Sequence, residues 1–212
     1  MKKPKLINIF KDDADLQSAL EQAIQTETDI DNFRFNNSCV EGQEASSIEF
    51  HNCVLENCEF IACRLNRIFF VDVVFEKCDL SNIDFSECVF HRVEFKNCKA
   101  VGANFTGTTL NNVLFQLCNC KYINLSSASI KHTCFVSSDL SQGSMQESKL
   151  KAVNFDDCKL LGVEFLHTPL KDIDFTTCDL GGILLSGDEL KGAIVTAYQA
   201  CELSRLLGLI IK

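Results

Sequence analysis

The stretch from Ile48 to Asn97 decides the fold, and it reads IEFHN-CVLEN-CEFIA-CRLNR-IFFVD-VVFEK-CDLSN-IDFSE-CVFHR-VEFKN. The middle residue of every group of five is Phe or Leu, and a small or apolar residue lies two places earlier. An α-helix would repeat every 3.6 residues and a strand every two. A strict period of five therefore predicts a repeat architecture. The same register runs from Ile30 to Leu190, with middle residues at the multiples of five that are nearly all apolar.

Residues twenty apart resemble each other more closely than residues five apart. One set of middle residues is almost entirely Phe: Phe35, Leu55, Phe75, Phe95, Phe115, Phe135, Phe155 and Phe175. One set of positions two before the middle is mostly Cys: Ser38, Cys58, Cys78, Cys98, Cys118, Ser138, Cys158 and Cys178. Four groups of five therefore make one turn, which predicts a four-sided parallel solenoid of roughly eight coils and about 38 Å. Looser coils are expected over 38–47 and 126–149, where polar residues or Gly take inward positions.

The register divides the chain into three segments. Residues 1–29 do not keep it and are predicted to cap the first coil, because a terminal repeat needs a polar outer face. Within them, Leu6–Phe10 could form a strand, and apolar residues at helical spacing behind acidic ones predict a helix over about 13–25. Residues 30–190 form the solenoid. Residues 191–212 form the C-terminal segment.

The C-terminal segment is predicted to close the rod. Thr196 can cap a helix that runs to about Leu207, with Gly208 as its stop, and a short strand is expected over 209–211. An apolar set exposed at the end of a solenoid is a natural surface for a two-fold homodimer. Its members are Tyr198, Leu203, Leu206, Leu207 and Ile210.

The composition argues against several classes of function. The 212 residues carry a net charge of −9 and a sequence pI near 4.9, which disfavours direct binding to nucleic acid phosphates or to an anionic membrane. Nine of the 13 Cys occupy inward positions, where we expect small buried thiols rather than disulfides or metal ligands. No signal-peptide-like run or membrane-spanning stretch is found, so a reducing cytoplasm is expected.

No catalytic, metal or cofactor site is predicted. His51 and His91 share a face but lie two coils, about 10 Å, apart, too far to share a zinc ion with bonds of about 2.0–2.1 Å. No Gly-rich phosphate loop, nucleophile elbow or pair of catalytic carboxylates occurs. The chain is therefore predicted not to be an enzyme. Thiol redox or metal chemistry is the alternative, and it requires cysteines that titrate readily in the native protein.

The candidate site is an acidic surface. The outward position just before the middle residue carries twelve acidic and five basic residues. Stacking places two acidic columns on adjacent faces, with Lys99, Lys159 and Arg64 interrupting them. The candidate partner-binding residues are Glu44, Glu59, Asp79, Asp84, Asp139, Glu164 and Asp179. Such a surface can present negative charge to a DNA-binding protein, or it can serve only solubility.

Groups such as CEFIA, CDLSN, IDFSE, ANFTG, INLSS, VNFDD and IDFTT follow the pattern A(D/N)LXX. Over about residues 30–190 the chain thus resembles the pentapeptide repeat proteins, which implies an all-β, right-handed quadrilateral β-helix, here with short N-terminal and C-terminal helices. Within that family, functions are diverse.

The tail Ala193–Lys212, with Tyr198-Gln199-Ala200 followed by Leu206-Leu207-Gly208, resembles the C-terminal helix of the Qnr-type quinolone-resistance proteins. That resemblance implies a homodimer whose acidic rod mimics B-form DNA, binds DNA gyrase and topoisomerase IV, and protects them from fluoroquinolones. The unbroken register leaves no room for large loops, as in loopless members from Gram-positive bacteria. A structural or adaptor scaffold with an unrelated protein partner is the alternative.

Overall fold

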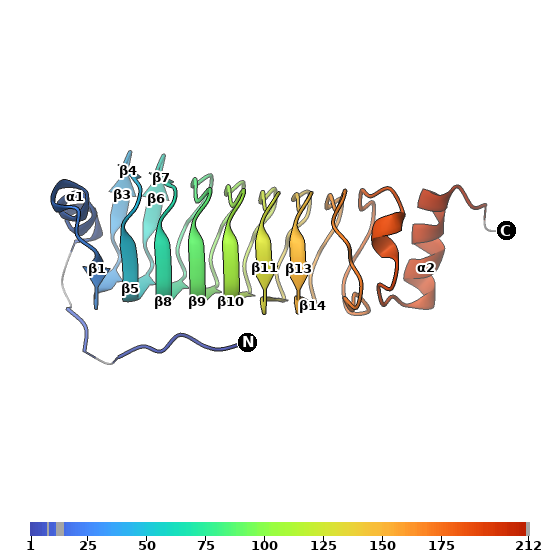
Figure 1. The fold of residues 1–212 in the computed structure, drawn as a ribbon, viewed down its shortest axis with the longest axis horizontal. Coiled ribbons are helices and arrows are strands. Elements are labelled where there is room, and N and C mark those ends of the chain that lie inside the picture. Colours follow the sequence, from blue (N-terminus) through green and yellow to red (C-terminus); the bar gives the residue numbers. More distant parts are fainter. Residues whose placement is uncertain (8, 12–14, 211–212) are drawn as a thin grey trace.

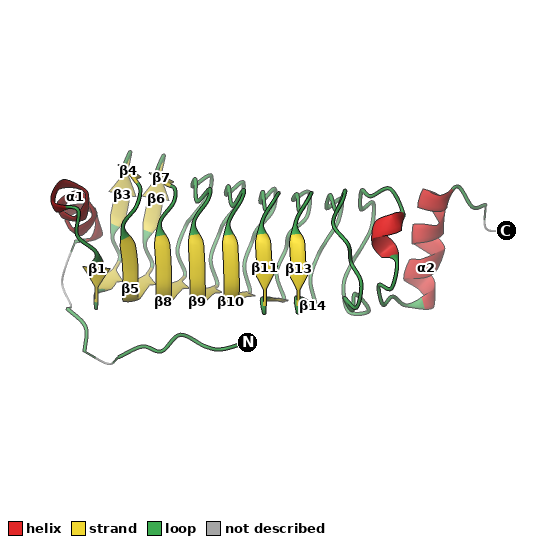
Figure 2. Ribbon diagram, in the orientation of Figure 1, coloured by secondary structure: helices red, strands yellow, loops and turns green. Residues whose placement is uncertain are grey.

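The structure is a computed structural model that describes residues 1–7, 9–11 and 15–210. It is a rod of stacked coils with a helix at each end (Figure 1). Part of the rod wall consists of short strands, and the rest, including the coils after Asp156, consists of turns and loops (Figure 2). The elements in chain order are α1 (Leu16–Thr26), β1 (Ile30–Asp31), β2 (Arg34–Asn36), β3 (Cys39–Glu41), β4 (Glu44–Ala45), β5 (Glu49–Glu56), β6 (Glu59–Ile61), β7 (Arg64–Leu65), β8 (Phe69–Glu76), β9 (Val89–Lys96), β10 (Thr109–Gln116), β11 (Ser129–Lys131), β12 (Cys134–Val136), β13 (Lys149–Lys151), β14 (Asn154–Asp156), the 3-10 helix η1 (Asp188–Leu190), α2 (Ala197–Leu203) and the 3-10 helix η2 (Ser204–Leu207).

Every strand pairs in parallel with the strand twenty residues away. Ile30 pairs with Phe50 and Phe50 with Phe70, and the ladder continues in the order β1-β5-β8-β9-β10-β11-β13. Single bridges with the same offset extend the stack as far as Asp174 and Ile194. The twenty-residue period read from the sequence is therefore the length of one coil, and the predicted solenoid is confirmed.

The chain turns each corner with a left-handed residue two places after the middle one. Asn37 (φ 52°) and Gly102 (φ 68°) suit this conformation, but Leu117 (φ 55°) and Tyr122 (φ 60°) adopt it as well. A non-Gly residue there costs about 1–2 kcal/mol. Ladder hydrogen bonds offset that cost, as when the Leu117 N–H donates to the Val136 carbonyl at 3.0 Å. The stacked geometry thus imposes the corner conformation even on bulky residues.

Stacked phenylalanines fill one side of the core. The Phe115 ring lies between those of Phe95 and Phe135, with centroid distances of 4.6 and 4.9 Å and interplanar angles of 9° and 10°. The stack continues to Phe155 at 5.1 Å. All four side chains are at most 1% exposed. The predicted Phe stack is present.

Cysteines line another side, and serine replaces them without loss of register. The Cys118 thiol donates to the carbonyls 23 and two residues before it, both at 3.4 Å. The Ser138 hydroxyl makes the same two bonds at 3.4 and 2.9 Å. A side chain at Gly143 would place its Cβ 2.9 Å from the Leu140 carbonyl oxygen and 3.0 Å from that of Ile123. The coils expected to be loose between 126 and 149 are thus hydrogen-bonded and close-packed.

Helix α1 covers the first coil. Asp15 caps it by accepting the Ser18 N–H at 2.9 Å, and Leu16, Leu20 and Ala23 are buried in the core. The helix thus begins slightly later than predicted, while residues 13 and 14 lie outside the described part of the chain. Residues 6, 7, 9 and 10 form no strand; the segment before α1 instead runs back along the rod (Figure 1).

The C-terminal helix is shorter than predicted. Helix α2 ends at Leu203, and the chain then tightens into η2 before Gly208 (φ 72°) ends the turn. Short 3-10 segments of this kind are common at helix ends. Leu209 and Ile210 are not in a strand, contrary to the prediction, and residue 211 lies outside the described residues.

Candidate functional site

Two columns of outward side chains carry the predicted acidic residues. Bridges at the twenty-residue offset align one residue per coil on each face. The first acidic column contains Glu59, Asp79, Asp139 and Asp179, and the second contains Glu44, Asp84 and Glu164. The structure thus brings these carboxylates into the rows that the register predicted, with Lys99, Lys159 and Arg64 at the predicted interruptions.

Basic residues neutralise part of this surface. Four of the seven acids lie in ion pairs: Asp79 with Lys99 (2.9 Å), Glu44 with Arg64 (3.4 Å), Asp84 with Arg64 (3.5 Å) and Asp139 with Lys121 (3.6 Å). Glu59, Glu164 and Asp179 lie in no ion pair within the described residues. Exposed pairs of this kind contribute about 0–1 kcal/mol to stability. Their main consequence is a weaker negative potential along both columns.

The same acidic position also builds the turns of the coil. One Asp79 carboxylate oxygen accepts the Ser81 N–H at 3.0 Å. Burial would raise the pKa of Asp79, but its hydrogen bonds with Ser81 and Lys99 outweigh that effect and lower it. Asn104 accepts the Thr106 N–H in the same way at 3.1 Å. Asp and Asn therefore serve this turn equally, a role that the sequence reasoning missed although the D/N alternation signals it.

The C-terminal helix is fixed to the last coils by its own cap. The Thr196 hydroxyl accepts the Gln199 N–H at 3.2 Å, and the Gln199 side chain accepts the Thr196 N–H at 2.8 Å. The Gln199 amide also donates to the carbonyls of Phe175 and Cys178, both at 2.8 Å. Leu203 is 8% exposed and belongs to the core. It therefore anchors the helix to its own chain, which corrects its predicted place in a dimer interface.

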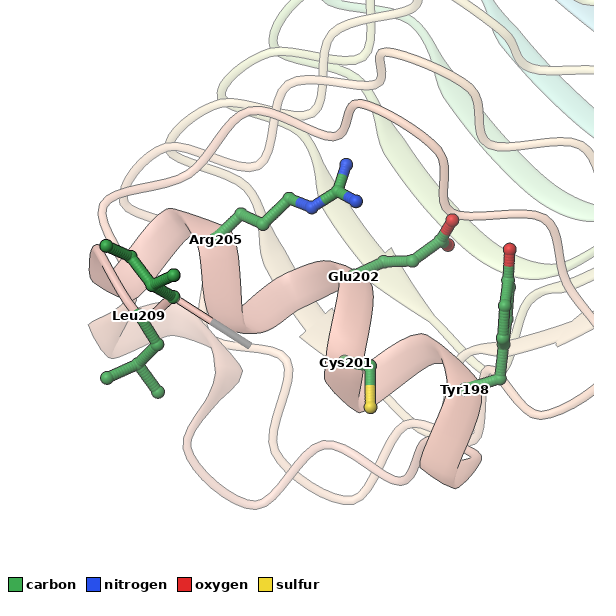
Figure 3. Close-up of a pocket in the computed structure, with 6 residues that line it drawn as sticks. Tyr198, Cys201, Glu202, Arg205 and Leu209 are labelled. Atoms are coloured by element: carbon green, nitrogen blue, oxygen red, sulfur yellow. The ribbon is translucent and has the colours of Figure 1, made fainter. Parts of the chain in front are cut away.

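Other apolar residues of the predicted interface lie on the surface. Tyr198 is 73% exposed, Leu206 40% and Ile210 87%, whereas the side chain of Leu207 lies outside the described part of the chain. Tyr198, Glu202 and Arg205 extend to one side of the helix (Figure 3), where a shallow depression of about 470 Å³ opens. Its lining consists of Tyr198, Cys201, Glu202, Arg205, Leu209 and Ile210.

Cys53 and Cys88 have the surroundings of structural residues. Burial raises the pKa of the Cys53 and Cys88 thiols to about 12, which disfavours the reactive thiolate. His51 Nδ1 lies 3.5 Å from Asp31. Across residues 1–7, 9–11 and 15–210, no group of three or more His, Cys, Asp and Glu side chains is placed to hold a metal ion. None of the described helices is long and apolar enough to cross a membrane.

Comparison with known proteins agrees with the repeat geometry. Residues 43–125 and 68–142 match the family model for the pentapeptide repeat region. A search of curated proteins finds no match.

Several solved structures are similar to the rod. A trypsin-treated variant of QnrB1, a plasmid-mediated fluoroquinolone resistance protein, has a TM-score of 0.47 and 18% identity and covers 87% of this chain and 99% of its own. Another trypsin-treated QnrB1 variant has a TM-score of 0.44 and 24% identity, and the match covers 87% of this chain and 95% of the variant. HetL of the cyanobacterium Nostoc sp. strain PCC 7120 is described as involved in heterocyst differentiation regulation. It has a TM-score of 0.44 and 15% identity, and the match covers 78% of this chain and 90% of HetL. At these identities and TM-scores the likeness carries no conclusion about function. The matched repeats and the square stack of twenty-residue coils give the chain the pentapeptide repeat fold.

Proposed function

We propose that the chain is a homodimeric DNA mimic that binds a type II topoisomerase, DNA gyrase or topoisomerase IV, and protects it from fluoroquinolones. The observation that carries the proposal is the pair of acidic columns on a straight rod whose register no loop interrupts. A duplex presents regularly spaced negative charge to its partners, and carboxylates at about 4.8 Å per coil offer a similar row. The partner surface would be the basic DNA-binding surface of the enzyme.

The C-terminal end supports the dimeric part of the proposal. Tyr198, Leu206, Leu209 and Ile210 are exposed there, and an apolar patch at the end of a rod can be covered by the same patch on a second copy. Leu206→Asp is expected to give a monomer by light scattering, because it would bury a charge in that contact. Leu161→Asp is the matched control, since Leu161 is 36% exposed on the side of the rod. An unchanged dimer mass for the Leu206 variant would remove the helix from the interface.

The test of function is DNA supercoiling by purified gyrase, with and without a fluoroquinolone. The protein is expected to preserve supercoiling in the presence of the drug. The double variant Glu59→Gln, Asp179→Asn removes two of the acids that lie in no ion pair within the described residues, and it is expected to act more weakly. The double variant Glu27→Gln, Glu147→Gln changes two exposed acids outside both columns and is the charge-matched control. If the protein neither binds gyrase nor alters its activity, the proposal is wrong.

A second candidate is an adaptor scaffold that binds an unrelated protein partner. The pairing of four of the seven acids with Lys or Arg favours it, because these pairs give the rod a mixed-charge surface. Affinity purification from the native cell distinguishes the two functions. A specific, stoichiometric partner other than a topoisomerase, retained by the Glu59→Gln, Asp179→Asn variant, would support the scaffold.

A further inference from the structure

The N-terminal segment lies along one corner of the rod. It runs back from α1 beneath β5, β8, β9 and β10 (Figure 1). Three of its main-chain N–H groups donate to side-chain oxygens of that corner: Lys2 to Asn112 (2.7 Å), Lys5 to Asp72 (2.8 Å) and Ile7 to Asn52 (2.8 Å). The segment is thus held by residues 45 to 110 positions away in the chain.

The three acceptors are buried and held in position. Asn52 is 0%, Asp72 3% and Asn112 9% exposed. Arg92 fixes the Asp72 carboxylate through two bonds, from Nε at 2.6 Å and from Nη2 at 2.5 Å. Asn52 donates its amide to the Asn32 side-chain oxygen at 2.6 Å. A buried acceptor without a donor costs about 1–3 kcal/mol, so the side-chain oxygens of Asn52 and Asn112 require an N–H donor from whatever covers this corner.

The spacing of the acceptors fits an extended chain. Asn112 and Asp72 are two coils apart, about 9.6 Å, and the three residues from Lys2 to Lys5 span about 10 Å when extended. The coil between these acceptors presents Arg92, whose side chain has donors only. Pro4, which has no N–H, lies between the two donating residues of the segment. The segment therefore places an N–H donor beside Asn112 and beside Asp72. It needs no donor beside Arg92, on the coil between them.

The side chains of the donating residues contribute little to this contact. Ile7 is 56% exposed, and Lys2 and Lys5 are exposed as well. Pro4 and Leu6 are half-buried, so the segment adds some apolar contact to its main-chain hydrogen bonds. A ligand held in this way by a few hydrogen bonds binds weakly by itself and gains most of its occupancy from being tethered.

The corner changes character where the segment ends. Beyond Asn112, the equivalent corner positions are His132 and Ala152, so the amide and carboxylate acceptors stop. Directly beside them, Lys131 pairs in register with Lys151 on β11 and β13, and both are exposed. These lysines would repel a lysine-bearing chain that extended further. Acceptor chemistry and charge together limit the bound segment to the coils between Asn52 and Asn112.

We propose that this corner is a binding site for an extended peptide, recognised through main-chain N–H groups, and that the N-terminal segment occupies it in cis as an exchangeable ligand. The site is separate from the acidic columns and from the C-terminal helix. An extended segment of a partner protein can take the same place when the N-terminal segment leaves. The N-terminal segment then acts as a tethered competitor, at an effective concentration of the order of millimolar.

The first test measures whether the segment is docked in solution. In the full-length protein, the amides of Lys5 and Ile7 are expected to exchange with solvent at least ~10-fold more slowly than in an unstructured peptide. Asn52→Ala is expected to lower the protection at Ile7. Asn97→Ala is the matched control, because Asn97 has the same left-handed conformation (φ 53° against 50°) on an exposed corner. Exchange of both amides at the rate of a free peptide would overturn the proposal.

The second test measures exchange of the ligand. In the full-length double variant Lys5→Pro, Ile7→Pro, the segment loses two of its donors without a change in the core. A fluorescent peptide of residues 1–11 is expected to bind this variant saturably, and to bind the wild-type chain at least ~10-fold more weakly because its own segment competes. The same peptide with Pro at its fifth and seventh positions is the control. No saturable binding up to ~1 mM, the lower end of the tethered effective concentration, would refute an exchangeable site.

Discussion

Removing one ring from the middle of the Phe stack tests whether stacking between coils stabilises the rod. Phe115 is 1% exposed and stacks on Phe95 at 4.6 Å and on Phe135 at 4.9 Å. Phe115→Ala removes the ring and leaves a cavity between two rings that remain about two coils apart. Because strand pairing fixes the coils above and below, the site cannot collapse to fill the gap.

The expected cost follows from the buried ring. Truncation of a buried Phe to Ala costs about 3–5 kcal/mol. For a chain of this length, 4 kcal/mol corresponds to a fall in Tm of about 8–16 °C. Phe115→Leu is the matched control, since Leu55 already occupies the same column. That variant is expected to cost about 1.5 kcal/mol or less, as for an apolar substitution of nearly conserved volume.

Equilibrium unfolding in urea, followed by far-ultraviolet circular dichroism, measures both costs. The midpoint of Phe115→Ala should fall while the slope stays that of the wild type, because the same surface is exposed on unfolding. A loss below about 1.5 kcal/mol for the Ala variant, or equal losses for Ala and Leu, would contradict a close-packed ring stack.

Three further predictions concern the thiols, the Cys positions and the last coils. Native protein is expected to react quickly with a thiol reagent at the exposed Cys39 and Cys201, more slowly at the half-buried Cys134, and at the ten buried cysteines only after denaturation; fast titration of the buried set would instead support thiol chemistry. Cys118→Ser should keep nearly wild-type stability in urea, because Ser138 makes the same two bonds in the next coil. Cys118→Val should be less stable, because it removes the two bonds that the thiol makes to the carbonyls of Phe95 and Gln116; equal losses would contradict that role. Burial would raise the pKa of Glu189, but the N–H groups of His167, Ser186 and Gly187, at 2.9–3.0 Å, and the Ser186 hydroxyl outweigh it and lower the pKa to about 2. Since the pKa of Glu189 is lower in the native protein than in the unfolded chain, the stabilisation is present above about pH 4.5 and is lost as the pH falls towards 2. Glu189→Gln is therefore expected to cost about 1.5–3 kcal/mol of stability at pH 7 and to make the stability depend less on pH in this range. If both proteins lose stability in parallel as the pH falls, Glu189 does not have this role.

The coil itself could be predicted from the sequence because its cause is periodic. Residues twenty apart lie on the same face of adjacent coils. The recurrence of Phe at 115 and 135 therefore predicts the contact between the two rings. The acidic columns followed from the same register. The ion pairs that partly neutralise these columns could be predicted only in part. The register does not predict the Lys121–Asp139 pair, because its two residues belong to different columns of adjacent coils.

The docking of the N-terminal segment could not be predicted in this way. Asn52 and Asn112 were explained by the corners they occupy, and a left-handed corner is sufficient reason for Asn. Their second role appears only when a non-repeating segment returns across the rod, with Lys2 contacting a residue 110 positions away. Leu203 shows a related limit: its apolar character suits either a dimer or a core, and only the packing of α2 on the last coils distinguishes the two.

The constant offset of twenty has a consequence for how such a chain can change its length. Because of this pairing, the position of a residue in the twenty-residue period determines which face of the rod it lies on and whether its side chain points inward or outward. Phe50, Phe70 and Phe90 are an example. Loss of one residue within a coil would move every later side chain into its neighbour's role, so that outward acids would face the core unless a corner absorbed the shift. Loss of twenty residues would shorten the rod by one coil and leave every wall unchanged. The register is therefore compatible with the gain or loss of whole coils, and it is disrupted by the gain or loss of single residues.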